Sequence, residues 1–519
     1  MSAPAPGPGG SSAVPGPDAP PVRGFLFDPN QCTGCSACAL ACSTENELGW
    51  GVSWRQVVPF NAERRAGVPS FHLSLACNHC TDAPCVTHCP TGAMARDPKT
   101  GAVVVNADTC IGCRYCAWVC PYDAPRFDED RGVMTKCTLC NHKLATGGLP
   151  ACAEACPTGA LDFGPLPLGS AEGPARLPGF PGKKWEPRIA FTPLRRNARP
   201  PESTWSVPPE VAAAFGGGEA GDSTQGTDTT PGSGATGGPG TGGHAQPTST
   251  RLPRPSSPAA RRLSRPHLSL LGEVPLWVFT TGMAGLVGWV GAAVLGGAPL
   301  PLGAFVASAA ILLAVSTVHL GRPLRAWRAL ANVRTSALSR EIAYVNGFFA
   351  LGTLWLAWGG AGGAPWLPGA PTGTPLIGLG LAATLVGIFA LGQIDHVYEP
   401  VRGKGRIHSA QALLTGPMVA AALMAAPMAY MPFAFLKLFL YARRKRWTTS
   451  LGAMDAALRV GGLVAPPALW ALAPGAGIGW TALLLVMGES LDRADFYREL
   501  AIEGPREQAI RDAAGWSAG

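Results

Sequence analysis

The chain has 519 residues, enough for several domains, and 47% of them are hydrophobic while 14% are charged. Its formal net charge of +8 is modest for this length, and its basic residues are not interleaved with aromatic ones, which excludes a nucleic-acid groove. All 16 cysteines lie between Cys32 and Cys156, whereas the last half is poor in charge and rich in Leu, Ala, Gly, Trp and Val. We therefore predict two domains of different kinds.

Residues 1–22 are mainly Pro, Gly, Ala and Ser, with no apolar run. This composition predicts a disordered tail. The segment lacks the apolar region of a signal peptide and a twin-arginine motif, so we expect no export signal in it.

Residues 23–200 are predicted to form an iron–sulfur domain, because their cysteines fall into four groups of four. The groups are Cys32, Cys35, Cys38 and Cys42; Cys77, Cys80, Cys85 and Cys89; Cys110, Cys113, Cys116 and Cys120; and Cys137, Cys140, Cys152 and Cys156. The first and third follow the spacing C-x2-C-x2-C-x3-C, and a proline follows the last cysteine of the second, third and fourth groups, at Pro90, Pro121 and Pro157. In this run three near thiolates bind one 4Fe–4S cube and the fourth thiolate binds another, so the cysteines suffice for four cubes.

Two other interpretations stay open. An even number of cysteines can form disulfides, and C-x2-C pairs also bind zinc. The repeated ligand spacing disfavours disulfides, and the third cysteine of each run disfavours zinc. The sequence Cys-Pro-Thr-Gly-Ala occurs at 89–93 and again at 156–160, which indicates a duplicated ferredoxin-like unit of the α+β class. Regular structure should be sparse there, because metal ligation replaces a large apolar core.

Three motifs resemble the four-cluster electron-transfer subunit of the dimethyl-sulfoxide reductase family: Cys77-Asn-His-Cys, Cys110-Ile-Gly-Cys-Arg-Tyr-Cys and Lys136-Cys-Thr-Leu-Cys. The resemblance covers residues 24–200 and implies a crossed pairing of the cysteine groups. One cube would be bound by Cys32, Cys35, Cys38 and Cys156, a second by Cys137, Cys140, Cys152 and Cys42, a third by Cys77, Cys80, Cys85 and Cys120, and a fourth by Cys110, Cys113, Cys116 and Cys89. Some relatives replace the residue at Cys116, so its presence implies that all four are 4Fe–4S cubes.

Residues 201–267 are predicted to be a flexible linker of Gly, Ser, Thr and Pro. Residues 268–519 are predicted to form an all-α transmembrane bundle of about eight helices, because apolar segments recur that are long enough to cross a bilayer. The segments are 274–296, 301–319, 341–360, 375–395, 409–428, 431–442, 458–474 and 477–493. The sixth is short, so seven helices are the alternative.

The connections between these segments alternate in charge, which predicts their topology. Those near 297–300, 361–374, 429–430 and 475–476 contain no charged residue, whereas the others are basic, with five arginines between Arg322 and Arg340. The positive-inside rule places the basic side, and with it the iron–sulfur domain, on the cytoplasmic face of the bacterial inner membrane. The periplasmic face is the alternative, because a catalytic partner with its own signal can carry such subunits across.

The motifs His319-Leu-Gly-Arg-Pro, Ser336-Ala-Leu-Ser-Arg-Glu-Ile and Gly488-Glu-Ser-Leu-Asp-Arg resemble the membrane anchor subunit of the same family, which oxidises a menaquinol-type quinol. Quinol oxidation releases two protons, and a neutral His and a carboxylate can accept them. His319 and Glu341, at neighbouring helix ends, are the predicted quinol site, or else interfacial anchors.

Three further predictions concern the same end of the bundle. Arg322 and Arg325 either orient a quinone oxygen or mark the cytoplasmic face, and Asp395 with His396 is a second candidate site. We expect no haem, because the only histidines near helices are His319, His396 and His408, all at helix ends.

The sequence therefore predicts a non-catalytic subunit that oxidises quinol and relays electrons to a partner. The partner would hold a molybdenum or tungsten pterin and reduce an S-oxide, N-oxide or similar acceptor. One alternative is the same chain working in reverse, reducing quinone for a donor-oxidising partner, since sequence does not fix cluster potentials. Another is a membrane-tethered iron–sulfur redox sensor or scaffold.

Overall fold

A computed structural model describes residues 22–49, 51–64, 68–166, 177–180, 185–195, 270–296, 298–369, 373–399, 408–444, 450–472, 478–499 and 504–516. The chain divides into two compact units, of which one comprises residues 1–193 with 265–519 and the other residues 194–264. The predicted linker, 201–267, lies outside the described residues, and so does the predicted tail, 1–22, apart from Val22.

A three-stranded sheet joins the two ends of the cysteine-rich region. Strand β1 (Arg23–Phe27) pairs antiparallel with β8 (Leu161–Pro165) and parallel with β9 (Ile189–Phe191), in the order β8-β1-β9. Phe25 lies opposite Phe163, and their rings meet edge to face with centroids 5.7 Å apart. Aromatic pairs of this kind stabilise a sheet at its buried face. Because β1 precedes the first cysteine and β8 follows the last, the sheet brings the two ends of the cysteine-rich region together.

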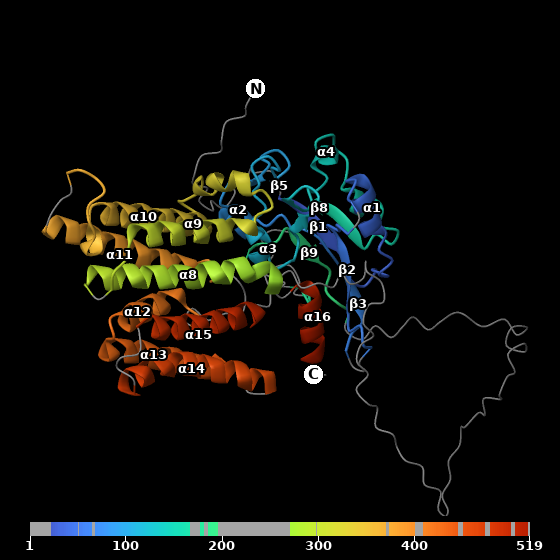
Figure 1. The fold of residues 1–519 in the computed structure, drawn as a ribbon. Coiled ribbons are helices and arrows are strands. Elements are labelled where there is room, and N and C mark those ends of the chain that lie inside the picture. Colours follow the sequence, from blue (N-terminus) through green and yellow to red (C-terminus); the bar gives the residue numbers. More distant parts are fainter. Residues whose placement is uncertain are drawn as a thin grey trace, which may run out of the picture. The chain divides into compact units, whose positions relative to one another are not determined.

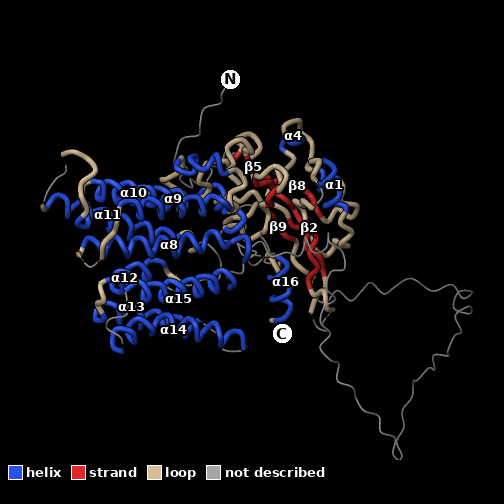
Figure 2. The backbone as a smooth tube through the Cα atoms, viewed as in Figure 1, coloured by secondary structure: helices blue, strands red, loops and turns tan. Residues whose placement is uncertain are grey.

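The cysteines between β1 and β8 lie partly on short helices and mostly in the loops between short elements. The strands form hairpins β2 (Gln56–Phe60) with β3 (Phe71–Leu75), β4 (Met94–Arg96) with β5 (Val103–Val105) and β6 (Arg126–Asp128) with β7 (Val133–Thr135). The helices are α1 (Ala37–Glu45), α2 (Pro84–Thr87), α3 (Tyr115–Trp118), α4 (Asn141–Leu144) and α5 (Ala151–Glu154). Figure 2 shows that the strands are confined to this region. The expected sparse α+β structure is what the described residues have.

The rest of the described chain is helical (Figure 1). The helices are α8 (Leu270–Val294), α9 (Leu302–Val318), α10 (Ala337–Ala357), α11 (Thr374–His396), α12 (Ala412–Leu423), α13 (Pro427–Arg444), α14 (Ser450–Leu472), α15 (Ile478–Glu499) and α16 (Pro505–Ala514), with the 3-10 segments η1 (Pro323–Leu330) and η2 (Gly360–Gly362). Helices α8 to α15 lie at the eight apolar segments of the sequence. Helix α10 begins four residues earlier than the apolar segment, because the Ser336 side chain caps it by accepting the Ser339 N–H.

Two of the described helices are long and apolar enough to cross a membrane, at Val274–Val294 and Thr374–His396, and α9 with η1 is a third candidate bent by 103°. Helix α11 carries an exposed apolar stripe at four-residue spacing, formed by Ile377, Leu381, Leu385 and Phe389, each 46–59% exposed. Exposed apolar rows of this length mark a membrane or protein contact, which agrees with an integral membrane helix. Eight crossings stay a prediction.

Candidate functional site

The four C-x2-C loops share one backbone feature, which recurs at the residue before the second cysteine. This residue has a positive φ in every loop: Gly34 (75°), His79 (44°), Gly112 (69°) and Leu139 (62°). The amide N–H of His79 donates to Cys77 Sγ at 3.4 Å, that of Gly112 to Cys110 Sγ at 3.4 Å, and that of Leu139 to Cys137 Sγ at 3.3 Å. The loops therefore direct backbone donors at sulfur, which stabilises a thiolate and suits an iron–sulfur ligand.

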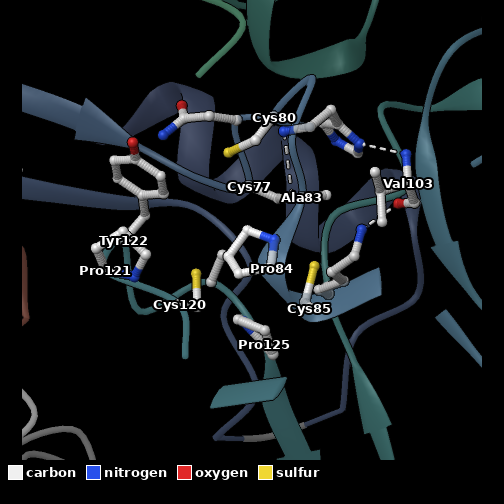
Figure 3. Close-up of a pocket in the computed structure, with 14 residues that line it drawn as sticks. Cys77, Cys80, Ala83, Pro84, Cys85, Val103, Cys120, Pro121, Tyr122 and Pro125 are labelled. Carbon is white, nitrogen blue, oxygen red and sulfur yellow. Dashed lines mark hydrogen bonds between the residues drawn. The ribbon is translucent and has the colours of Figure 1, made fainter. Parts of the chain in front are cut away.

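One cavity holds four cysteines from two different groups. Its lining includes Cys77, Cys80 and Cys85 of the second group and Cys120 of the third, around an empty space of about 370 Å³. In Figure 3 the sulfur atoms of Cys80, Cys85 and Cys120 face this space. This is the set that the family resemblance implies for the third cube.

The chemistry of this cavity fits a positively charged cluster of metal ions. Burial, and then the charge of Cys77, raise the pKa of Cys85 to about 12. Burial, and then the charge of Cys85, raise the pKa of Cys120 to about 12. Thiols gathered in this way bind as thiolates only when a cation compensates their charge, and iron would supply it. Among the described residues, no three His, Cys, Asp or Glu side chains gather as ligands of one metal ion.

Cysteines of different groups also lie near one another outside this cavity. Burial, and then chiefly Cys152, raise the pKa of Cys42 to about 12, and Asn46 Nδ2 lies 3.9 Å from the sulfurs of both Cys42 and Cys140. The thiols that act on Cys32 are Cys38, Cys156 and Cys35, and those that act on Cys113 are Cys89 and Cys110. The structure thus brings Cys42, Cys89 and Cys156 each beside the near cysteines of another group.

A segment of the helical region, residues 319–340, contacts the backbone around the third cysteine group; we call it the docking segment. The Arg322 N–H donates to Ile111 O at 3.1 Å, and Arg328 Nη1 donates to Asp108 O at 2.7 Å. Gly321 lies so close to Gly132 that a Cβ at Gly321 would fall 2.2 Å from Gly132 O. The loop around Cys110 and the docking segment therefore touch backbone to backbone.

The docking segment also contacts the residues around Cys89. Asn332 Nδ2 donates to Cys89 O at 2.8 Å, Ser336 Oγ to His88 O at 3.0 Å and Ser339 Oγ to Pro90 O at 3.2 Å. The set implied for the fourth cube consists of Cys89 with Cys110, Cys113 and Cys116 of the third group. Of the four sets, this is the one whose backbone the docking segment contacts in the described part of the chain.

The two arginines predicted to orient a quinone oxygen bind backbone carbonyls. Arg322 Nε and Nη2 lie 2.9 and 2.6 Å from Arg131 O, and Arg325 Nη1 lies 2.9 Å from Ala107 O. These guanidinium groups hold the docking segment to the cysteine-rich region. A quinone contact for either stays a prediction.

His319 and Glu341 lie at the same end of the bundle, in different surroundings. His319 follows α9 as its C-terminal cap, and its ring is buried beside the Ser316 backbone. Arg114 is the charged group that acts on it. Glu341 is 9% exposed, in the second turn of α10, and the charged groups that act on it are Arg493 and Asp395.

Aromatic side chains connect the Cys113–Cys116 loop to α11 and α15. Tyr115 Oη donates to Val397 O at 2.7 Å, and the Trp118 and Tyr398 ring centroids are 5.8 Å apart. The Tyr398 hydroxyl is hydrogen-bonded to that of Tyr497, and the Arg493 guanidinium lies 5.4 Å from the Tyr398 ring. Tyr398 was not predicted from the sequence, although its place beside His396 at the end of an apolar helix could have indicated it.

Asp395 and His396, the second candidate pair, have separate partners. Asp395 accepts the N–H groups of Ala412 and Leu413 at 3.0 Å each, which caps α12, and pairs with Arg493 at 3.2 Å. His396 Nδ1 lies 2.7 Å from Glu399. A second cavity, at the opposite end of α8, α10 and α11, is lined by apolar residues and glycines without an ionisable group.

Comparison with known proteins identifies both halves of the chain. Residues 68–166 match the family model described as a 4Fe-4S dicluster domain, and residues 306–358 match that of the DMSO reductase anchor subunit. The anchor match contains His319, Glu341 and the whole docking segment.

Several characterised relatives are similar to the iron–sulfur part. One of the chains of the anaerobic dimethyl sulfoxide reductase of Haemophilus influenzae is 42% identical over 152 residues, covering 28% of this chain and 74% of its own length. The corresponding reductase chain of Escherichia coli K12 is 44% identical over 151 residues, covering 28% and 73%. A sulfite dehydrogenase subunit of Allochromatium vinosum is 37% identical over 161 residues, covering 27% and 67%.

Proposed function

This protein belongs to the iron–sulfur subunit family of the anaerobic dimethyl sulfoxide reductases, here joined to an anchor domain, and we propose that it transfers electrons from a menaquinol-type quinol to a catalytic subunit. It is an iron–sulfur electron-transfer subunit with a membrane anchor. Four 4Fe–4S cubes, bound by the four crossed cysteine sets, would carry the electrons. The most direct support comes from the hydrogen bonds that the docking segment donates to the backbone carbonyls of Cys89, Ile111 and Asp108. These bonds join the anchor to the backbone of the set proposed for the fourth cube.

The proposed quinol site lies where the anchor meets that loop. Quinol oxidation releases protons, and Glu341 is a buried carboxylate that can accept one. His319 lies at the same end of the bundle, and a neutral imidazole has one ring nitrogen that can accept a hydrogen bond from a quinol hydroxyl. Tyr115 is the neighbouring tyrosine on the iron–sulfur side: burial, and then the charge of Glu341, raise the pKa of Tyr115.

The partner is proposed from the relatives' names. Each dimethyl sulfoxide reductase relative is named as one chain of a larger reductase, so the partner of this protein would be a catalytic subunit with a molybdenum or tungsten pterin, acting on an S-oxide, N-oxide or similar acceptor. The iron–sulfur domain would lie on the cytoplasmic face of a bacterial inner membrane, because the loops at that end are basic.

The reverse direction is the second candidate, in which the anchor reduces quinone. The similarity to a subunit of a sulfite dehydrogenase favours it, because that relative is named for an oxidation. Potentiometric titration separates the two: cubes whose potentials all lie well above the quinone couple would rule out the reverse direction.

The quinol site is tested by Glu341→Gln in the full-length chain, with Glu507→Gln, an exposed carboxylate on α16, as the matched control. We expect quinol-driven reduction of the clusters to slow about 100-fold in the first, because a general base is lost, and to stay unchanged in the second. Dithionite should reduce the clusters equally in both. Normal quinol oxidation by Glu341→Gln would remove Glu341 from the site.

A further inference from the structure

Arg55 is a fully buried cation within the cysteine-rich region. It precedes β2, and its side chain is 2% exposed. Its guanidinium lies 4.5 Å from the centroid of the Phe25 ring, and Nη1 donates to Ser74 O at 3.3 Å and to Ser74 Oγ at 3.0 Å. Burying a guanidinium is costly unless a negative charge compensates it, so its position needs an explanation.

Nothing among the described carboxylates compensates Arg55. No Asp or Glu in the described part of the chain forms an ion pair with it, and its Nε and Nη2 atoms are buried without a hydrogen-bond partner. A guanidinium stays protonated in proteins, so the charge cannot be removed by deprotonation. The compensating negative charge must therefore come from another kind of group.

The cysteine thiolates are the negative groups near Arg55. Burial alone would lower its pKa, but the neighbouring thiolates raise it above its usual value. In order of effect they are Cys152, Cys137, Cys38 and Cys42. Three of them belong to the set proposed for the second cube, and Cys38 belongs to the set proposed for the first.

We propose that Arg55 raises the reduction potentials of the first and second cubes relative to those of a chain without this charge. The inference rests on the proposed function, which assigns cubes to these sets. Each reduction adds one negative charge to a cube, and a buried cation stabilises that charge more than water-screened groups do. Arg55 is a positioning residue in this proposal, since it acts through the cysteine ligands and not on a substrate.

Ser74 extends the effect of Arg55 to the first cube. Its hydroxyl accepts a hydrogen bond from Arg55 Nη1, which leaves its proton free to point at Cys38 Sγ, 3.2 Å away. A hydrogen bond to a ligand sulfur also stabilises the reduced cube. Among the described residues no side chain links Arg55 to a cysteine of the second set in this way, so the second cube should respond to the charge of Arg55 alone.

The test is an anaerobic redox titration of the full-length chain, followed by electron paramagnetic resonance, for Arg55→Gln. Arg64→Gln is the matched control, because Arg64 lies in the same domain and is exposed. At a fixed ambient potential, the reduced-to-oxidised ratio of the first and second cubes should fall about tenfold in Arg55→Gln, equal to about 59 mV for a one-electron couple. The third and fourth cubes, and all cubes of Arg64→Gln, should keep their wild-type ratios.

Two further variants keep the proposal open to refutation if Arg55→Gln does not assemble. Arg55→Lys retains the charge and should keep both ratios near wild type, whereas Ser74→Ala should lower the ratio of the first cube only. Unchanged potentials in an assembled Arg55→Gln, or an unchanged first cube in Ser74→Ala, would overturn the proposal. A wild-type chain without cubes would instead overturn the proposed function.

Discussion

The four C-x2-C loops share a backbone conformation at the residue before the second cysteine. In each loop this residue takes a positive φ, which glycine is free to adopt without strain at Gly34 and Gly112. His79 and Leu139 take the same conformation without that freedom, so the fold imposes it there. The spacing predicts which near cysteines share a cube, while the prediction of the crossed partners comes only from the family resemblance.

The crossed pairing predicts which cube each cysteine belongs to. Cys120 lies in the third group of the sequence but lines the cavity with Cys77, Cys80 and Cys85. Changing Cys120 to Ser should therefore alter the resonance signal and potential of the third cube and leave the fourth, bound by Cys113 and its neighbours, intact. Cys116→Ser is the matched comparison and should do the opposite; loss of the same signal in both variants would contradict the crossed sets.

Buried cations near the cysteines were not predicted. Arg55 lies far from any motif, and Lys136, 2% exposed, donates to Cys137 O at 3.0 Å and to Val103 O. Their burial depends on hairpins that bring together residues 19 to 33 positions apart in the chain. No periodicity or spacing in the sequence distinguishes a basic residue that will be buried from one that will be exposed. Only the structure could therefore reveal that Arg55 and Lys136 are buried.

The docking segment is the element through which the anchor would deliver electrons to the proposed cubes, and its contacts with the cysteine-rich region are of long range. Its hydrogen bonds join residues 191 to 249 positions apart, across the Gly/Ser/Thr/Pro-rich stretch. The sequence predicted that basic residues gather here, but not that Arg322 and Arg325 would bind backbone carbonyls of the iron–sulfur region. Local patterns report charge and helix ends, whereas the partner of each guanidinium depends on the tertiary fold.

Gly321→Ala tests whether close approach at the docking segment matters. A Cβ at Gly321 would overlap Gly132 O, and overpacking of this kind costs about 1–3 kcal/mol. We expect the cubes to assemble normally while quinol-driven reduction slows roughly tenfold. Gly303→Ala in α9 is the control, since a Cβ there meets nothing within 4 Å. Equal rates in both variants would show that electron delivery does not require this contact.

Helices α13, α14 and α15 share a buried ionic network that was not predicted as a unit. Lys437 lies 2.5 Å from Glu489, and Arg459 lies 2.7 Å from Glu489 and 3.2 Å from Asp492. All four side chains are at most 3% exposed. Charges at this depth are tolerated only when paired, so the network specifies how the three helices pack.

Removing one member of this network should destabilise the bundle. We expect Lys437→Met to lower the free energy of unfolding by about 3 kcal/mol, because Glu489 loses a partner while it stays buried. Arg443→Gln, an exposed change on the same helix, should have little effect. Thermal unfolding in detergent measures both, and a Lys437→Met chain as stable as Arg443→Gln would show that the pair contributes nothing.

The iron–sulfur region and the helical anchor belong to the same compact unit, which comprises residues 1–193 and 265–519. The last helix, α16, contributes to this union, because Asp512 accepts the Gly179 N–H at 2.7 Å and Trp516 packs on Phe60 at 6.2 Å. Composition predicted the two halves, and apolar segments predicted where α8 to α15 lie. The return of α16 to β2 was not predicted, because a short polar helix carries no pattern that names its partner.

The central claim is that quinol delivers electrons to iron–sulfur cubes within this single chain. The most direct test first determines the iron content of the anaerobically purified full-length protein by elemental analysis. Reduced menaquinone is then added, and the signals of the cubes are followed by electron paramagnetic resonance. The account predicts about 16 iron atoms per chain and cube signals that appear on quinol addition. Stoichiometric zinc without iron, or cubes that dithionite reduces but quinol does not, would contradict it.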